Sequence, residues 1–269
     1  MKSLSWTPIK HAFASVALMA ACSTSAWSAD LPDFTFTPTA VGLTGAPVTA
    51  DNILVSDFSS VTFTGPTTFA EQGFLSITGF QLGGVNVVAG GLNSTYSLYF
   101  SFNGTGHNTL NAGSNPNTTV TAGVFDTLNY SLIGASGNST FGFMGTTPTV
   151  TSVAPQTLAT GSLINGNVIT SPANGNTAFV PSANATLTFV QAAGKQGFFS
   201  PQPFYNMAFS AFTNPVSTVT PFAGGFMINN GGGALNFTTA VPEPQTYALM
   251  LAGLGLMGFV ARRRKLNTI

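Results

Sequence analysis

The most regular pattern in the chain is Thr95-Tyr96-Ser97-Leu98-Tyr99-Phe100-Ser101-Phe102-Asn103. Large apolar side chains stand at every second position, and serine fills most of the positions between them. A strand with one buried face has this two-residue period, because successive side chains point to opposite faces of a sheet. The stretch therefore predicts a β-strand whose even-numbered residues face a hydrophobic core.

A partner for this strand is predicted at residues 124–133, where Leu128, Tyr130 and Leu132 share one side. We expect the two strands to pair with each other. The polar residues between them, 104–123, predict a long loop.

The rest of the body shows the same pattern in shorter pieces, and helical periodicity is absent from the sequence between the two termini. Residues 134–181 are low in complexity, with only a weak strand expected at 163–170. Further strands are predicted at 33–37, 52–64, 73–82 with a bulge at Gly79, 185–190 and 204–212, and a hairpin at 225–229 and 234–238. This pattern is typical of the all-β class. We expect residues 30–240 to fold as one extracytoplasmic β-sandwich, jelly-roll-like, with long polar loops.

Charged residues are rare in this body. Between residues 30 and 240 there is one basic residue, Lys195, against six acidic ones, a net charge of −5. Nucleic-acid binding needs a basic patch to neutralise phosphates, so the composition argues against a nucleic-acid partner.

The first 28 residues have the composition of a secretory signal peptide. Lys2 and Lys10 precede an uncharged apolar stretch at 12–21, and small residues follow it. Cleavage after Ala26 or after Ser28 would satisfy the small-residue preference of signal peptidase, and both sites stay open. We therefore expect a signal helix and export through the Sec machinery.

Cys22 is the chain's single cysteine. It is either part of the cleaved signal or, alternatively, the lipid-attachment site of a lipoprotein. On the first reading the mature protein has no disulfide and is held together by burial and backbone pairing alone.

Three features follow one another at the carboxyl end: Pro242-Glu243-Pro244, an uncharged apolar run at 247–261, and the basic residues Arg262, Arg263, Arg264 and Lys265. As a helix, the fifteen residues of the run would extend about 22 Å. This is less than the ~30 Å hydrocarbon core, so the run predicts a marginal transmembrane helix. Basic residues remain in the cytoplasm, so we expect everything before the motif to lie outside the inner membrane.

This tail, residues 241–265, resembles the PEP-CTERM sorting signal of Gram-negative bacteria that make exopolysaccharide. In that family a membrane-embedded cysteine protease, the exosortase, reads the Pro-Glu-Pro motif and removes the anchor. The resemblance implies that Pro242, Glu243 and Pro244 are the sorting and processing motif and that residues 262–265 fix the topology.

The body shows a second resemblance. The segments Asp33-Phe34-Thr35-Phe36 and Thr49-Ala50-Asp51-Asn52, together with residues 91–106, are similar to flocculation-associated PEP-CTERM proteins. In those proteins the secreted domain helps to hold cells in exopolysaccharide flocs. The resemblance implies a role in floc or biofilm formation.

Few side chains of the body are suited to catalysis. His107 has no neighbouring histidine or cysteine with which to bind zinc, and we expect it to be solvated in a loop. Glycoside cleavage needs a pair of carboxyl groups, and the spacing of the acidic residues singles out no pair. We therefore predict that the protein is not an enzyme.

A calcium site is the one cofactor that the residues suggest. Asp51, Asp57 and Glu71, together with Asn52, could supply the carboxylate and carbonyl oxygens that calcium prefers. The alternative is that Asp51 and Asn52 form a turn and that Asp57 faces solvent.

Four tyrosines on predicted strands are candidates for stacking on sugars: Tyr96, Tyr99, Tyr130 and Tyr205. The favoured alternative is that their rings belong to the core.

These observations lead to one main hypothesis. The chain is exported, held transiently in the inner membrane, processed by an exosortase, and released to the cell surface or extracellular matrix. There it acts as a structural or adhesive protein that contacts extracellular polysaccharide. The alternatives are a secreted carbohydrate-active enzyme and a permanently membrane-anchored envelope protein.

Overall fold

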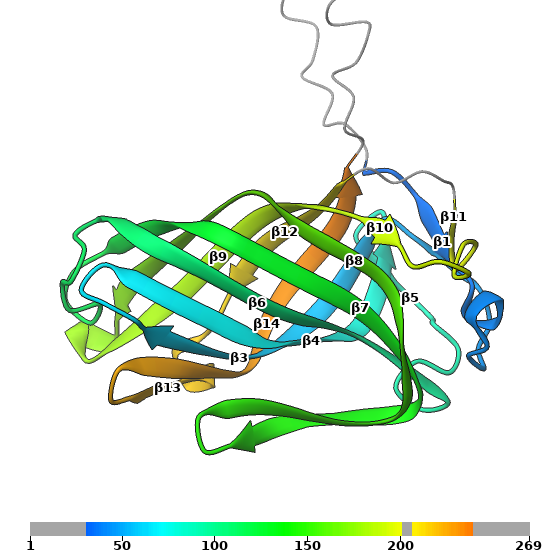
Figure 1. The fold of residues 1–269 in the computed structure, drawn as a ribbon, viewed down its shortest axis with the longest axis horizontal. Helices are drawn as coiled ribbons and strands as arrows, with labels where there is room; N and C mark the ends of the chain where they lie inside the picture. The colour runs from blue at the N-terminus through cyan, green and yellow to red at the C-terminus, as the bar shows by residue number, and fades with distance from the viewer. Residues whose placement is uncertain (1–30, 201–205, 239–269) are drawn as a thin grey trace, which may run out of the picture. The chain divides into compact units, whose positions relative to one another are not determined.

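The computed structural model describes residues 31–200 and 206–238, and most of these residues lie in antiparallel β-strands (Figure 1). The predicted all-β class is confirmed. The helical elements in these ranges are 3₁₀ turns: Pro38–Val41 (η2), Asn174–Asn176 (η3) and Val216–Thr218 (η4). A helix long and apolar enough to span a membrane is not found in the part of the chain described. The expected signal helix (1–28) and transmembrane helix (247–261) lie outside the described residues.

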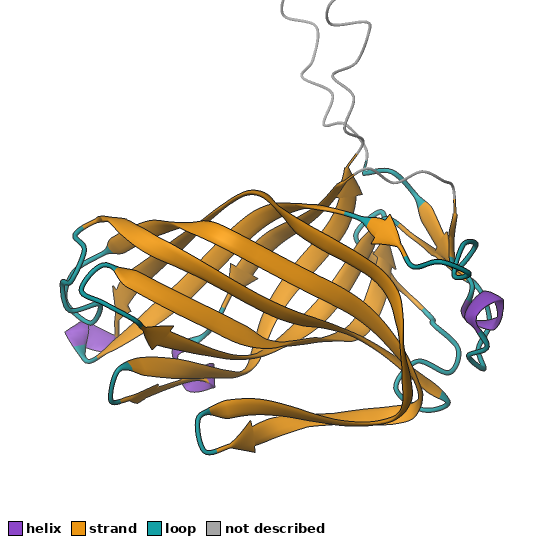
Figure 2. Cartoon of the chain, viewed as in Figure 1, coloured by secondary structure: helices purple, strands orange, loops and turns teal. Residues whose placement is uncertain are grey.

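Eight long strands form one antiparallel sheet that closes on itself (Figure 2). Around the ring the order is β8, β7, β6, β4, β3, β14, β12 and β9, and β9 pairs again with β8. The bounds are Asn52–Phe63 (β3), Thr68–Leu82 (β4), Tyr96–Leu110 (β6), Thr121–Met144 (β7), Thr147–Ala173 (β8), Ala178–Thr188 (β9), Asn206–Thr213 (β12) and Gly225–Thr238 (β14). Short strands extend the sheet: Val85–Val87 (β5) beside β4, Val190–Gln191 (β10) beside β8, and Val219–Phe222 (β13) beside β14.

The expected β-sandwich is therefore wrong in its closure. A sandwich has two facing sheets with free edges, whereas the β8–β9 ladder joins the two ends of this sheet. Periodicity indicates which face of a strand is buried. It does not indicate which strand pairs with each edge, so it cannot distinguish the two architectures.

The long polar loops were also overestimated. Strand β6 continues to Leu110, so the loop before β7 covers only residues 111–120. Residues 134–181, predicted to be mostly irregular, contain the second part of β7 and the whole of β8. Threonine is favoured in strands, and asparagine, serine and glycine are tolerated there when a long ladder on each side supplies the pairing. The sequence pattern of these strands is weak because the ladder, and not apolar alternation, specifies them.

Residues 225–238 form one strand where a hairpin was predicted. Gly225–Thr238 runs without reversal as β14, paired with β3 from Gly225 to Leu235 and with β12 from Gly232 to Thr238. The register slips at Asn230, which lies between the pairs Asn229↔Phe58 and Gly231↔Asp57 and has a φ of 62°. Asn230 is therefore the extra residue of a bulge, and the glycines after it pair with β3 in the strand and do not form a turn.

The predicted pairing of the two clearest strands is confirmed, since Phe100 of β6 lies opposite Leu132 of β7. The predicted bulge at Gly79 is also confirmed: Leu54 pairs with Gly79, but Val55 pairs with Ile77. Tyr96, Leu98 and Phe100 are fully buried inside the ring, as their alternation requires.

A separate three-stranded sheet packs against the core residues at one end of the ring. It consists of β1 (Phe34–Phe36), β2 (Val48–Ala50) and β11 (Phe199–Ser200), in the order β11-β1-β2. Phe34 contacts Phe80, Phe199 and Phe237 with ring centroids 5.1–6.2 Å apart, in edge-to-face geometry. Such ring pairs add about 0.5–1.5 kcal/mol each to the burial of their apolar surface. This end of the interior is therefore filled with aromatic side chains.

The tip of the β7–β8 hairpin covers part of the outer face of the ring (Figure 1). We call residues 137–154 the outer arm. Positive φ angles at Gly137 and Ala154 mark the bend at its base, where the β7–β8 register also shifts. Phe141 of the arm contacts Phe58, Phe74 and Tyr99 at 5.3–6.2 Å. The arm thereby buries aromatic rings that alternate to the outside of the sheet.

Candidate functional site

A cavity of about 410 Å³ lies inside the closed sheet. Its lining comes from the inner faces of several strands and from the loops at 64–67 and 111–120. An eight-stranded closed sheet has room for interior side chains or for one small ligand. The cavity is in the size range of small-molecule sites.

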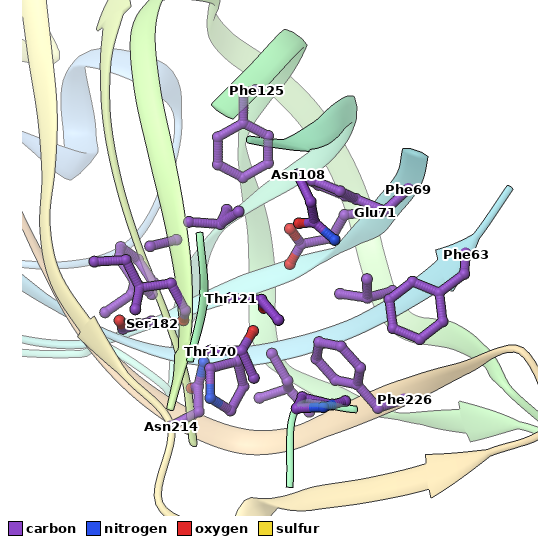
Figure 3. A pocket seen from close by; sticks show the side chains of 18 of the residues that line it. Phe63, Phe69, Glu71, Asn108, Thr121, Phe125, Thr170, Ser182, Asn214 and Phe226 are labelled. Atoms are coloured by element: carbon purple, nitrogen blue, oxygen red, sulfur yellow. Dashed lines mark hydrogen bonds between the residues drawn. The ribbon is translucent and has the colours of Figure 1, made fainter. Parts of the chain in front are cut away.

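Apolar side chains make most of its lining. Phe63, Phe69, Phe125 and Phe226 surround the space, as Figure 3 shows. Phe69 and Phe125 meet edge to face at 5.8 Å, within a second hydrophobic cluster distinct from the main core. Leu75, Leu128 and Phe209 belong to both the lining and the main core. The cavity therefore lies directly against the main core.

Two carboxyl groups line this apolar space. In β3 the odd-numbered residues from 53 to 61 are buried, and Asp57 takes one of these inward positions, with its residue 3% exposed. On β4, Glu71 is half-buried and its carboxyl points into the cavity (Figure 3). They are the only ionisable side chains in the described lining.

The β3–β4 register explains how the two acids come together. Asp57 pairs with Leu75, Ser59 with Gly73, and Val61 with Glu71. The pair between the acids, Ser59 and Gly73, has little side-chain volume. A Cβ atom on Gly73 would lie 2.6 Å from both the Ser59 Cβ and the Phe58 carbonyl oxygen. The strands thus approach closely here, between the two carboxyls.

Burial controls the protonation of both groups. Desolvation raises the pKa of Asp57 well above its ordinary value, and repulsion from Glu71 raises it further. Desolvation likewise raises the pKa of Glu71 to about 7. The nearby Ser59 hydroxyl lowers both pKa values to a smaller extent. Near neutral pH the pair therefore holds fewer charges than two surface carboxylates would.

Buried polar atoms beside the pair have no hydrogen-bond partner in the described structure: Asp57 Oδ1, Ser59 Oγ and Asn214 Oδ1. Asn214, which is 3% exposed, also lines the cavity (Figure 3). Its side chain takes the space that a Cβ atom on Gly231 would need, and Gly231 is the β14 partner of Asp57. Polar atoms left unpaired in an interior cost free energy. This cost is the strongest sign of a site in the fold.

The structure brings together part of the predicted calcium set. Asp57 and Glu71 share the cavity, but Asp51 lies six residues before Asp57, about 20 Å along an extended strand. Asp51 Oδ2 accepts a hydrogen bond from the Gly83 amide at 2.7 Å, and Asn52 donates to Gln81 at 3.0 Å. The described residues contain no group of three acidic, histidine or cysteine side chains that could hold a metal. The alternative that Asp57 faces solvent is wrong, since closure of the sheet buries it.

His107 is in a strand rather than in the expected loop. It lies near the end of β6, and its Nδ1 is 2.8 Å from Asp126 Oδ1 of β7. Both side chains are more than 40% exposed. The expectation that His107 is solvated is confirmed, and neither residue lines the cavity.

The tyrosines in the described ranges are buried, as the favoured alternative predicts: Tyr96 and Tyr130 in the main core, and Tyr99 beneath the outer arm. Tyr96, Tyr99 and Tyr130 are at most 4% exposed. The hydroxyl of Tyr130 donates to the Thr188 carbonyl oxygen at 2.8 Å. Tyr205, Pro242, Glu243, Pro244 and the basic residues 262–265 lie outside the described residues.

A comparison with known families identifies the motif in the carboxyl-terminal segment. Residues 240–265 match the PEP-CTERM protein-sorting motif. The PEP-CTERM motif indicates an exported protein that an exosortase recognises during membrane transit. No curated protein and no solved structure shows a significant match to the chain.

The cavity is the feature that the sequence pattern did not predict. The sequence did contain a signal for it, because Asp57 shares the apolar face of β3 with Ile53, Val55 and Val61. An acid at such a position is buried if the strand is central. Periodicity alone could not show that Glu71 faces the same space.

Proposed function

We propose that the chain is an exported, exosortase-processed structural or adhesive protein of the extracellular polysaccharide matrix. The observation that supports it is the sorting motif at residues 240–265. The body is suited to this role because its outward-facing residues are mostly uncharged Thr, Asn, Ser and Gly, which can hydrogen bond to sugar hydroxyls. In this proposal Sec and signal peptidase act first, the exosortase acts next, and polysaccharide is the final partner.

The flocculation-associated resemblance gives the proposal its biological setting, which is floc or biofilm formation. We propose that the domain contributes contact between cells and exopolysaccharide rather than chemistry. The paired carboxyls Asp57 and Glu71 would be the natural residues of a rival glycoside-cleaving enzyme. Their surroundings argue for the non-enzymatic role, because an apolar enclosure of about 410 Å³ is poorly matched to a polysaccharide chain, which needs an extended polar groove.

The sorting step is tested by changing its motif. Glu243→Ala should leave full-length protein in the membrane fraction, whereas Gln245→Ala, just outside the motif, should be processed normally. The masses of the protein from membranes and from culture fluid, with and without the exosortase, report both cleavage bonds. Secreted protein that still contains the basic residues 262–265 would contradict the proposal. Full-length protein that stays in the membrane fraction when the exosortase is present would favour a permanent anchor.

The matrix role is tested with the protein released into culture fluid and the polysaccharide of the same cells. We expect the protein to sediment with the polysaccharide and to leave its chain length unchanged. Released oligosaccharide that disappears in Glu71→Gln would instead identify the enzyme. Absence of any co-sedimentation would overturn the adhesive function.

A further inference from the structure

Two residues that carry an unpaired, buried polar atom line the interior cavity. Asp57 Oδ1 and Asn214 Oδ1 belong to residues only 3% exposed, both line the cavity, and neither has a hydrogen-bond partner in the described structure. A folded protein ordinarily pairs such atoms. A ligand group that donates hydrogen bonds would satisfy them.

The charge of the cavity restricts the ligand. Asp57 and Glu71 are its ionisable side chains, and the described lining contains no lysine, arginine or histidine to balance them. A carboxylate or phosphate would be repelled here. A positively charged group would favour the ionised form of both acids, whose pKa values burial raises, and would donate several hydrogen bonds to them.

The size and the rings define the rest of the ligand. The space of about 410 Å³ suits a single small molecule, and Phe63, Phe69 and Phe226 offer ring surface to it. Aromatic faces favour apolar groups and tolerate a nearby cation. The lining loops 64–67 and 111–120 are at one end of the ring. The chain's β1–β2–β11 sheet packs at the other, so a ligand would enter between the loops.

We propose that this cavity binds a small apolar or aromatic molecule that bears a basic amine. The ammonium group would lie between Asp57 and Glu71, and the hydrocarbon part would lie among the phenylalanine rings. This site is independent of the sorting step, because none of its residues belongs to the sorting motif.

The test measures binding of three matched probes: 4-butylbenzylamine, 4-butylbenzyl alcohol and 4-butylbenzoate. They share one hydrocarbon part and differ in the charge of the head group. The full chain is kept in one non-ionic detergent throughout, so partitioning of probes into micelles is common to all samples. Titration calorimetry and the shift of the unfolding midpoint are the two readouts.

Three variants make the test specific. Asp57→Asn/Glu71→Gln removes both charges, the single Glu71→Gln serves if the double variant fails to fold, and Asp33→Asn removes an exposed acid as the control. We expect the amine to bind the natural protein at least about tenfold more tightly than the alcohol, from a charged hydrogen bond. The preference should be lost in the Glu71 variants and unchanged in Asp33→Asn. The carboxylate should not bind.

Equal affinities for the amine and the alcohol would overturn the proposal, as would amine binding that survives removal of the carboxyls. Absence of saturable amine binding to the folded natural protein would also overturn it. Stabilisation by calcium chloride alone, with no response to the amine, would overturn it in favour of a metal site at the two carboxyls.

Discussion

Ser97 of β6 and Ser139 of the outer arm share a buried hydrogen bond of 2.6 Å on the outer face of the closed sheet. A second bond joins Tyr99 Oη to Ser152 Oγ at 3.1 Å. These contacts fix the arm against β6 and exclude water from the outward side of that strand. Strand β6 is therefore buried on both faces over its first residues, although only its inner face points into the closed sheet.

The ring of Phe141 should anchor this arm. Phe141→Ala removes its contacts with Phe58, Phe74 and Tyr99, and we expect the free energy of unfolding to fall by about 2 kcal/mol, below the range for fully buried rings. Urea unfolding measures the change. Met144→Ala at the exposed tip is the control and should change stability by less than about 0.5 kcal/mol. A loss in Phe141→Ala no larger than about 0.5 kcal/mol would show that this ring does not anchor the arm.

The buried acids should make stability depend on pH. Their folded pKa values exceed the unfolded ones, with Glu71 at about 7, so the unfolded chain binds fewer protons as pH rises. The stabilisation is complete below the unfolded pKa values. We expect the free energy of unfolding to fall by about 2–3 kcal/mol between about pH 4.5 and about pH 7.5.

Urea unfolding at a series of pH values tests this dependence. Asp57→Asn/Glu71→Gln should flatten the curve and raise stability at pH above about 7, since it removes buried charge without removing volume. Asp33→Asn should follow the natural protein. If the free energy of unfolding of the double variant still fell with pH at the same slope, Asp57 and Glu71 would not be the cause of the dependence.

Two glycines on β4 should respond oppositely to alanine. A Cβ on Gly73 would lie 2.6–2.7 Å from backbone and Cβ atoms of Phe58 and Ser59, whereas a Cβ on Gly79 would meet only Leu54 Cδ1 at 3.9 Å. Gly73→Ala should therefore cost about 2–4 kcal/mol through overpacking. Gly79→Ala should be neutral or stabilising by up to about 1 kcal/mol. Thermal and urea unfolding measure both changes. A loss of less than about 1 kcal/mol in Gly73→Ala would contradict the close approach of β3 and β4.

The hydroxyl of Tyr130 should stabilise the closure of the ring. It bonds to the Thr188 carbonyl oxygen at 2.8 Å and so joins β7 to β9 over the intervening β8. Tyr130→Phe leaves that carbonyl without this donor, and we expect a loss of about 1–2 kcal/mol. Hydrogen exchange of the β8–β9 ladder measures where protection is lost. If the β8–β9 amides of the variant kept the protection of the natural protein, the hydroxyl of Tyr130 would not stabilise the closure.

Alternation predicted the strands whose two faces differ strongly, and the structure agrees there. Tyr96, Leu98 and Phe100 are inside, the 124–133 strand pairs with them, and the Gly79 bulge is present. Prediction failed where strands consist of small polar residues, as in β8, because their pairing is specified by neighbours distant in sequence. Only part of the candidate site could be predicted. The sequence singled out Asp57 and Glu71, but it grouped them with Asp51 as calcium ligands, and Asp51 does not line the cavity.

The sequence by itself determined that the chain carries an export and sorting signal and that its fold is all-β. The PEP-CTERM motif is read in linear order by its recognition machinery, and a two-residue period follows from strand geometry alone. Only the tertiary structure decided that the sheet closes through β8 and β9, and that closure encloses Asp57 and Glu71 in one apolar space. The reason is that burial depends on what lies across the ring from a residue, and no local pattern contains that information.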